Sequence, residues 1–337
     1  MADRLEQARP PWWPSSRGPG GLLERLRFSS HGLVMIAVVA TLALAGQALN
    51  TGFLSPANIG NILAIASVLA IATAGQTLVM VSGAGVDISI GAVMSLGAIL
   101  TVEIQNHRNE MILPSLAVVL AAGALTGLLN GLGVIKAKVP SLVLTFATAS
   151  IVESVELIYT KGSPYGKPAP LVSFVGTMRL LPWLPWLVFV AGVVVVVMHF
   201  LMNRSVFGKW VYAAGSNGNA ADLAGIRTAR VRITAFVLCG VFSAFAGFWF
   251  AAYNTFMKVG EADYLNMPVL AVVLIGGTTF SGGRGSYYGS LAGAVILTLV
   301  TSLLIMVHST EPIKLIINGL ILLVLLAIYN RETAIRQ

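Results

Sequence analysis

Long apolar runs follow one another along almost the whole chain, and they restrict its possible folds more than any other feature of the sequence. Hydrophobic residues make up 56% of the 337 residues, and charged residues only 10%. Inside a bilayer, only helices and closed barrels satisfy every backbone N–H and C=O group, and a crossing helix needs about 20 apolar residues. Although the length would suffice for two soluble domains, the sequence therefore predicts an all-α polytopic bundle that lies in a membrane.

The apolar runs can be divided into about ten transmembrane helices. Several runs are short or contain glycine and proline, so eight to ten spans fit the sequence. No signal-peptide cleavage site adjoins the first run, and we take it as an uncleaved first span. The predicted spans are 33–49, 62–82, 90–105, 113–135, 140–160, 183–202, 232–254, 266–277, 286–307 and 313–330.

Basic residues indicate how the chain is oriented. With ten spans and a cytoplasmic N-terminus, 15 of the 21 Lys and Arg residues fall in cytoplasmic segments, in agreement with the positive-inside rule. We expect a cytoplasmic N-terminal tail at 1–30, a transmembrane domain at 31–331 and a cytoplasmic C-terminal tail at 332–337. Orientation in the bilayer also explains the net charge of +8, which in a soluble protein would suggest a nucleic-acid partner. No nucleic acid is expected here.

A hydrophilic stretch at 203–232 separates two long apolar runs. It holds five basic residues and one acidic residue, which places it in the cytoplasm. We expect a short helix within it, with Asn219 as the N-cap and Gly225 at the end. A helix of two turns is unstable alone, so it should pack on something. The alternative is a loop that only follows the membrane surface.

A carboxylate stands in another interruption of the apolar pattern, the run from Gly85 to Gly91. Asp87 is costly in a bilayer unless it finds a donor, by about 2.5–3.5 kcal/mol at the centre of a span. Asp87 or Ser89 can cap a helix that starts near Ile90. The alternative is that Asp87 contacts a transported substrate.

Two glycine-rich segments, 79–98 and 272–294, resemble each other. Each has an apolar start, a break rich in Gly, Ser and Thr, and an end with spaced glycines. Paired helix breaks often mark a transport pathway. The alternative is that glycine is simply abundant, since the chain has 35, and that the breaks are packing sites. The span count places both breaks on the same side of the membrane, so an inverted repeat is not predicted.

Further polar residues lie inside predicted spans. Glu153 and Glu156 share one face of a helix. We expect Glu156 to reach the outer interface and Glu153 to lie deeper. Asn130 should form hydrogen bonds between helices.

The sequence contains no pattern that indicates catalysis. The Gly-x4-Gly-Lys-Ser/Thr loop that binds phosphate is missing, and no His/Asp/Glu or Ser/His cluster occurs. Cys239 is the only cysteine and lies in an apolar run, and the four histidines are scattered near predicted span ends. We expect no catalytic residue, no cofactor and no metal site.

Several of these stretches resemble ABC importers of the ribose, xylose and galactoside type, which belong to the superfamily of branched-chain amino acid and sugar permeases. The 85–91 run is similar to their Gly-Ile-Asp-Leu-Ser-Val-Gly motif, and the loop at 203–232 to a degenerate Glu-Ala-Ala-x3-Gly motif. Asn219 replaces the usual Glu, Ala224 a usual Ser, and Glu153 stands where the family often has a basic residue. The resemblance covers about residues 60–330. It implies an ATPase-coupling loop with Gly215, Asn217, Ala220, Ala221, Gly225 and Ile226. It implies a pathway or helix break with Asp87, Ser89, Gly91, Asn130, Thr145, Glu153, Gly276, Gly277, Gly282 and Gly283.

The resemblance implies a transport subunit rather than an enzyme. Such a permease lies in the bacterial inner membrane and works with a separate ATPase subunit, a periplasmic substrate-binding protein and a second permease subunit, identical or different. The expected cargo is a pentose or hexose. Alternatives are a nucleoside, a branched-chain amino acid or a signalling sugar as cargo. An ion-coupled secondary transporter is a further alternative, for which only Asp87 and Glu153 would be available as ionisable groups in mid-membrane.

Overall fold

The computed structural model describes residues 19–254 and 256–307, together with residues 313, 316, 317, 319, 320 and 323. This part of the chain is helical apart from loops and one short hairpin. The α-helices are α2 (Pro19–Leu49), α3 (Pro56–Val81), α4 (Ile90–Gln105), α5 (Ile112–Ile135), α6 (Ser141–Thr160), α7 (Pro170–Thr177), α8 (Leu187–His199), α9 (Val206–Ser216), α10 (Gly218–Leu223), α11 (Thr228–Asn254), α12 (Asn266–Ile275) and α13 (Tyr287–Met306). Shorter elements are η1 (Asn109–Met111), the π-helical turn η2 (Phe200–Arg204), η3 (Asp263–Leu265), β1 (Arg179–Leu181) and β2 (Leu184–Pro185).

The predicted all-α membrane bundle is confirmed. Nine of the ten predicted spans coincide with helices, namely α2 to α6, α8 and α11 to α13. Among the described residues, seven helices are long and apolar enough to cross a membrane, whereas α4 and α12 are apolar but shorter. The tenth predicted span, 313–330, lies mostly outside the described residues. Of the predicted tail at 1–30, residues 1–18 lie outside them as well. The rest of the tail belongs to α2, which continues without a break across residue 30.

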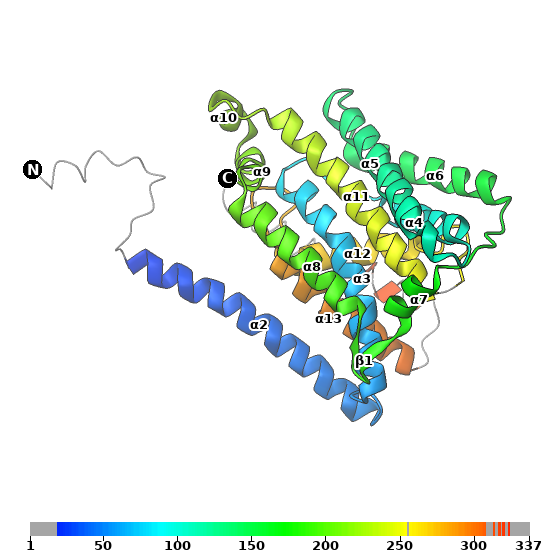
Figure 1. Ribbon diagram of the computed structural model, residues 1–337. Helices are drawn as coiled ribbons and strands as arrows, with labels where there is room; N and C mark the ends of the chain where they lie inside the picture. Colours follow the sequence, from blue (N-terminus) through cyan, green and yellow to red (C-terminus); the bar gives the residue numbers. More distant parts are fainter. Residues whose placement is uncertain are drawn as a thin grey trace, which may run out of the picture.

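Helix α11 runs through the middle of the bundle and packs against α3, α4 and α5 (Figure 1). Glycines make these contacts close. A Cβ added to Gly75 of α3 would overlap the Cα of Cys239, and one added to Gly123 of α5 would overlap the carbonyl oxygen of Gly240. Gly97 of α4 lies equally near, because its added Cβ would be 2.5 Å from the Ala244 oxygen. Small residues let transmembrane helices approach each other in this way.

Helix α2 runs along one side of the bundle, where it contacts α13 (Figure 1). Only 6% of its apolar stretch at 32–49 is buried, and large apolar side chains such as Ile36 and Leu44 are more than 60% exposed. Such a surface suits lipid contact.

Some boundaries differ from the prediction. Helix α3 begins at Pro56, six residues before the start of the predicted span at 62–82. Ser55 is its N-cap and proline takes the first helical position, where its missing N–H is not needed. The predicted loop between the fifth and sixth spans also contains α7 and the β1–β2 hairpin, which we did not predict. Arg179 of β1 anchors the hairpin to α3 by donating to the Asn61 side chain (2.7 Å).

Candidate translocation and coupling site

The chain between α3 and α4, residues 82–89, is a helix break, and side chains accept from the N–H groups of its second half, residues 86–89. Ser141 Oγ accepts from Val86 N (3.2 Å), and Thr145 Oγ1 accepts from Ile88 N (3.1 Å). Both acceptors belong to α6. A buried non-helical backbone needs such partners, because water is not available to it. Helix α6 therefore fixes the course of this segment, and Ser141 is a contributor that the sequence analysis missed.

Asp87 lies in this break with only 4% of its surface exposed. Its Oδ1 accepts from the Ser89 N–H (2.8 Å) and from the Ser89 hydroxyl (2.6 Å). Ser89 takes the N-cap position of α4 but makes no capping hydrogen bond with its side chain. The predicted side-chain cap of α4 is therefore wrong for Ser89, and Asp87 instead forms a turn with Ser89 just before the helix.

Asn130 of α5 joins Asp87 and Ser89 to α6. Its Nδ2 donates to Ser89 Oγ (2.9 Å), and its Oδ1 accepts from the Thr148 hydroxyl (2.7 Å). The predicted role of Asn130 in hydrogen bonding between helices is confirmed. Thr145, also predicted, is fully buried beside this network, so four of the predicted pathway residues lie together: Asp87, Ser89, Asn130 and Thr145.

Gly91, in the first turn of α4, connects the break to α12. Its N–H donates to the Asn266 side chain (2.6 Å), and a Cβ at Gly91 would lie 2.8 Å from the Ala262 oxygen. The first turns of α4 and α12 thus meet inside the bundle. With 16 and 10 residues, these helices are about 24 and 15 Å long. Since the hydrocarbon core is about 30 Å thick, each falls short of a full span.

The second break, between α12 and α13, touches the first. Gly277, Gly282 and Gly283 all have positive φ angles there, a conformation that glycine adopts without strain. The Gly283 N–H donates to the carbonyl oxygen of Val81 at the end of α3 (2.8 Å). The two glycine-rich segments therefore meet on one side, as the span count predicts. Gly276 packs on α13, where its Cβ would overlap the backbone of Ser290.

The hydrophilic stretch at 203–232 contains two helices, α9 and α10, that lie at one end of the bundle, away from β1 (Figure 1). The predicted short helix is α10. Its N-cap is Asn217, and not Asn219 as we predicted. The Asn217 Oδ1 accepts from Ala220 N (3.0 Å). Gly225 ends the helix as predicted, with φ +84°, and the Ile226 N–H donates to the Ala221 oxygen (3.0 Å).

The six predicted coupling residues face different directions. Ala221 is 5% exposed and faces the permease side of α10, and Ile226 packs against the core. Ala220 and Gly225 are exposed, and Asn217 is the cap. Gly215 belongs to α9 and contacts both helix breaks. The largest apolar group on the outer face is Leu223, which is 91% exposed and was not predicted.

Of the two glutamates of α6, Glu156 does not reach water, contrary to our prediction. Glu156 is fully buried, and its Oε2 accepts from the Ser95 hydroxyl (2.8 Å) and from Gly260 N (3.2 Å). Glu153 is exposed. The loop before η3 reaches back to α6 and covers Glu156, and a Cβ at Gly260 would lie 2.9 Å from Asp263 Oδ2 and 3.8 Å from Glu153 Oε1. Three carboxyl groups therefore surround Gly260.

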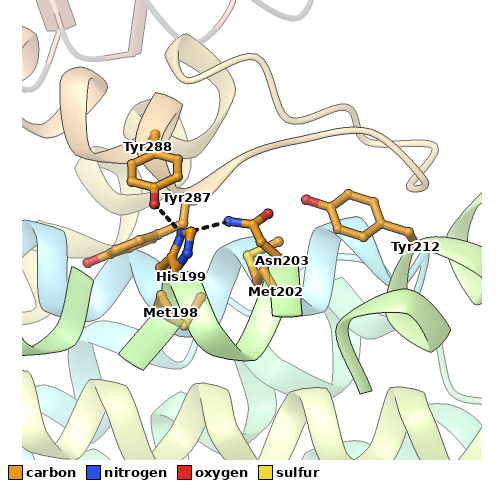
Figure 2. A pocket seen from close by; sticks show the side chains of 7 residues that line it. All are labelled: Met198, His199, Met202, Asn203, Tyr212, Tyr287 and Tyr288. Carbon is orange, nitrogen blue, oxygen red and sulfur yellow. Dashed lines mark hydrogen bonds between the residues drawn. The ribbon is translucent and has the colours of Figure 1, made fainter. Parts of the chain in front are cut away.

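A shallow pocket lies beside the turn η2 (Figure 2). His199 Nδ1 is 2.6 Å from the Tyr288 hydroxyl and 3.3 Å from Asn203 Nδ2, so these polar groups bond with one another. The pocket is lined by Met198, His199, Met202, Asn203, Tyr212, Tyr287 and Tyr288. None of the predicted site residues lines it. Within the described part of the chain, no group of three or more His, Cys, Asp and Glu residues could hold a metal ion.

Comparison with known proteins decides the family. Residues 58–326 match the family of permease components of branched-chain amino acid transport systems. The chain belongs to this permease family. The permease is 29% identical over 305 residues to the ribose import permease protein RbsC of Escherichia coli K12, a match that covers 89% of this chain and 92% of that protein.

Other relatives have related names. The ribose import permease of Haemophilus influenzae is 28% identical over 302 residues, with 88% of this chain and 92% of the relative covered. The autoinducer 2 import system permease protein LsrC of Yersinia pseudotuberculosis is 29% identical over 322 residues, with 94% and 90% covered. No solved structure matches the chain significantly. The permease is thus a multi-pass membrane protein similar to sugar import permeases.

Proposed function

We propose that this permease is the membrane subunit of an ABC importer that carries a sugar across the bacterial inner membrane. A separate ATPase subunit docks on α10 and supplies the energy, and a periplasmic binding protein delivers the cargo. A second permease subunit completes the pathway. Both termini and the α9–α10 stretch are cytoplasmic. The names of the relatives support the cargo class, since two of them import ribose and one imports autoinducer 2.

The observation that carries this proposal is the shape and the surface of α10. This short helix is capped at both ends and exposes Leu223 by 91%. A large apolar side chain that stands on a polar, basic stretch is suited to insert into an apolar pocket of a partner protein. The neighbouring residues Ala220 and Ala224 are small and exposed, so a partner surface can approach closely. The same end of the bundle holds both helix breaks.

Ion-coupled secondary transport is less well supported by the geometry. It requires an ionisable group that can change its partners within the membrane. Asp87 is buried and already accepts from two donors of Ser89. Glu156 is buried and already accepts from Ser95 and Gly260, and Glu153 is exposed. Other cargoes in the same mechanism, such as a nucleoside or a branched-chain amino acid, differ from the proposal only in substrate.

The test is co-purification with the cognate ATPase subunit, together with ribose uptake in cells that lack other ribose importers. Leu223→Asp should reduce ATPase recovery and uptake by about tenfold or more, since removal of a central apolar anchor typically costs 2 kcal/mol or more. Asn219→Asp is the matched control, because it adds the same charge to an exposed position of the same helix. The purified permease without its partner should show no ATP hydrolysis.

Two results would contradict the proposal. Normal ATPase recovery with Leu223→Asp would show that α10 is not the docking element. ATP hydrolysis by the permease alone would show that it does not depend on a separate motor. Uptake of another cargo but not of ribose, with ATPase dependence intact, would change the substrate and keep the mechanism.

A further inference from the structure

The end of α9 touches both helix breaks through backbone. A Cβ added to Gly215 would overlap the carbonyl oxygen of Val81 and the amide nitrogen of Gly283. One added to Gly282 would lie 2.6 Å from the Cα of Gly83. Three segments that are far apart in the sequence therefore meet at Gly83, Gly215, Gly282 and Gly283. No side chain lies between these backbones to absorb a displacement, and only two residues separate Gly215 from the start of α10 at Gly218.

Arg232 of α11 joins α9 to the first break. Its Nε donates to the carbonyl oxygen of Ser82 (3.2 Å), and its Nη2 donates to that of Ala214 (3.0 Å). Ser82 is the C-cap of α3, and Ala214 lies in the last turn of α9. Carbonyl groups at helix C-termini lack intrahelical donors and carry partial negative charge. One guanidinium group thus binds the ends of two helices at once.

Tyr212 of α9 joins the same helix to the second break. Its hydroxyl donates to the carbonyl oxygen of Gly285 (2.8 Å). Burial raises the pKa of Tyr212 above its usual value, so the hydroxyl keeps its proton and remains a donor. In Figure 2 this side chain stands in the wall of the pocket, opposite Tyr288.

We propose that Arg232 and Tyr212 are positioning residues that connect α10 to both helix breaks, so that a displacement of α10 by the ATPase moves the two breaks together. The inference rests on the proposed function, since it requires an ATPase that docks on α10. The breaks also hold each other through the bond from Gly283 N to Val81 O (2.8 Å). A displacement of α9 is therefore transmitted to both breaks. In the first break it moves the segment that holds Asp87, five residues after Ser82, and in the second break it moves the glycines before α13.

A purely structural role for the two residues predicts something different. If the two residues only stabilise the fold, their substitution lowers the amount of inserted protein and its thermal stability. A connection between docking and transport leaves the assembled complex intact and uncouples it: ATP is hydrolysed, but the cargo-loaded binding protein no longer stimulates hydrolysis and cargo is not moved. The ratio of transport to basal ATP hydrolysis, measured without the cargo-loaded binding protein, separates the two roles.

The experiment uses the permease assembled with its cognate ATPase and binding protein in liposomes. Tyr212→Phe removes one hydroxyl from a half-buried ring, and Arg232→Gln removes the guanidinium. Tyr288→Phe is the control for the first variant, since its hydroxyl bonds with His199 and not with a break. Arg230→Gln is the control for the second, since Arg230 is exposed on the same helix and makes no side-chain hydrogen bond with described residues.

We expect Arg232→Gln to keep ATPase docking and to lower stimulated ATP hydrolysis and transport by about tenfold, because two charge-assisted bonds are lost. Tyr212→Phe should lower them by about threefold to fivefold, as one neutral bond is lost. Both controls should behave like the unaltered permease. If Arg232→Gln is not inserted, Tyr212→Phe alone decides.

Normal stimulation and transport in Tyr212→Phe, or an equal loss in Tyr288→Phe, would overturn the inference. The inference would also be overturned if transport by the variants fell only in proportion to the amount of inserted protein. The proposed function fails by a different result, namely the absence of ATPase docking and of ATP-dependent transport in the unaltered permease.

Discussion

Asp87 illustrates how a carboxylate is placed inside an apolar protein. Its Oδ1 binds two donors of Ser89, and Asn130 extends the network to α6. The sequence alone indicated that Asp87 and Asn130 need partners, because polar groups in a bilayer are costly without them. It could not indicate Ser141 or Thr148, since hydroxyl side chains in a helix also bond to their own backbone. Nothing in an apolar pattern distinguishes the two uses.

Substitution of Asp87 tests whether its role is structural. Asp87→Asn keeps an oxygen that can accept from Ser89, so we expect near-normal abundance and uptake. Asp87→Leu leaves the Ser89 N–H and hydroxyl without this acceptor, at a cost of about 1–3 kcal/mol for each buried group, and should lower the amount of folded permease severalfold. Quantitative immunoblots and uptake assays on both variants provide the measurement. Loss of uptake at normal abundance in Asp87→Asn would instead place the charge on the transport pathway.

Glu156 shows a limit of sequence analysis at the same scale. Helical periodicity placed Glu153 and Glu156 on one face, and proximity to the span end suggested that Glu156 reaches water. The structure buries Glu156 because the loop at 256–262 folds back and donates the Gly260 N–H to it (3.2 Å). The path of a loop about 100 residues away in the sequence leaves no trace in the local pattern of α6.

At the scale of elements, long helices were predicted better than short ones. The spans at 90–105, 113–135 and 140–160 match α4, α5 and α6 within one residue at each end, because length and hydropathy identify apolar helices directly. Helices α7 and α9 were missed. Helix α9 is partly polar and lies between a π-helical turn and a cap, so its 11 residues give no run of apolar residues to detect.

The N-cap of α10 provides a prediction at this scale. Asn217→Ala removes the bond to Ala220 N, and a lost cap typically costs about 1 kcal/mol. Since α10 has only six residues, we expect it to fray and ATPase recovery to fall by about threefold to fivefold. Asn219→Ala is the control, because Asn219 is exposed and does not cap the helix. Co-purification of the ATPase measures both variants, and an equal loss in each would show that capping is not the cause.

At the scale of the whole molecule, the orientation of the chain across the membrane is a prediction that can be tested. The excess of basic residues predicts that residue 217 and the C-terminus at 337 are cytoplasmic and that residue 110 is outside. Fluorescent-protein fusions at 217 and 337 should therefore be active, and an alkaline phosphatase fusion at 110 should be active. Phosphatase activity at 217 or 337 would contradict this topology and with it the cytoplasmic position of α10.

The glycine contacts of α11 divide the molecule into rigid bodies. Backbone lies on backbone where α11 meets α3, α4 and α5, and again where Gly276 of α12 meets Gly289 of α13. Helices in such contact cannot slide without collision. Between the two bodies, side chains form part of the contact: Thr77 Oγ1 lies 2.9 Å from Ser290 Oγ, and the Tyr287 hydroxyl donates to the Ala70 oxygen (2.9 Å). At the helix breaks the two bodies meet backbone to backbone, at Gly83 and Gly282. We therefore expect a change of shape that involves α12 and α13 to be a rotation about this line of contacts, which ends at the two helix breaks beside α9.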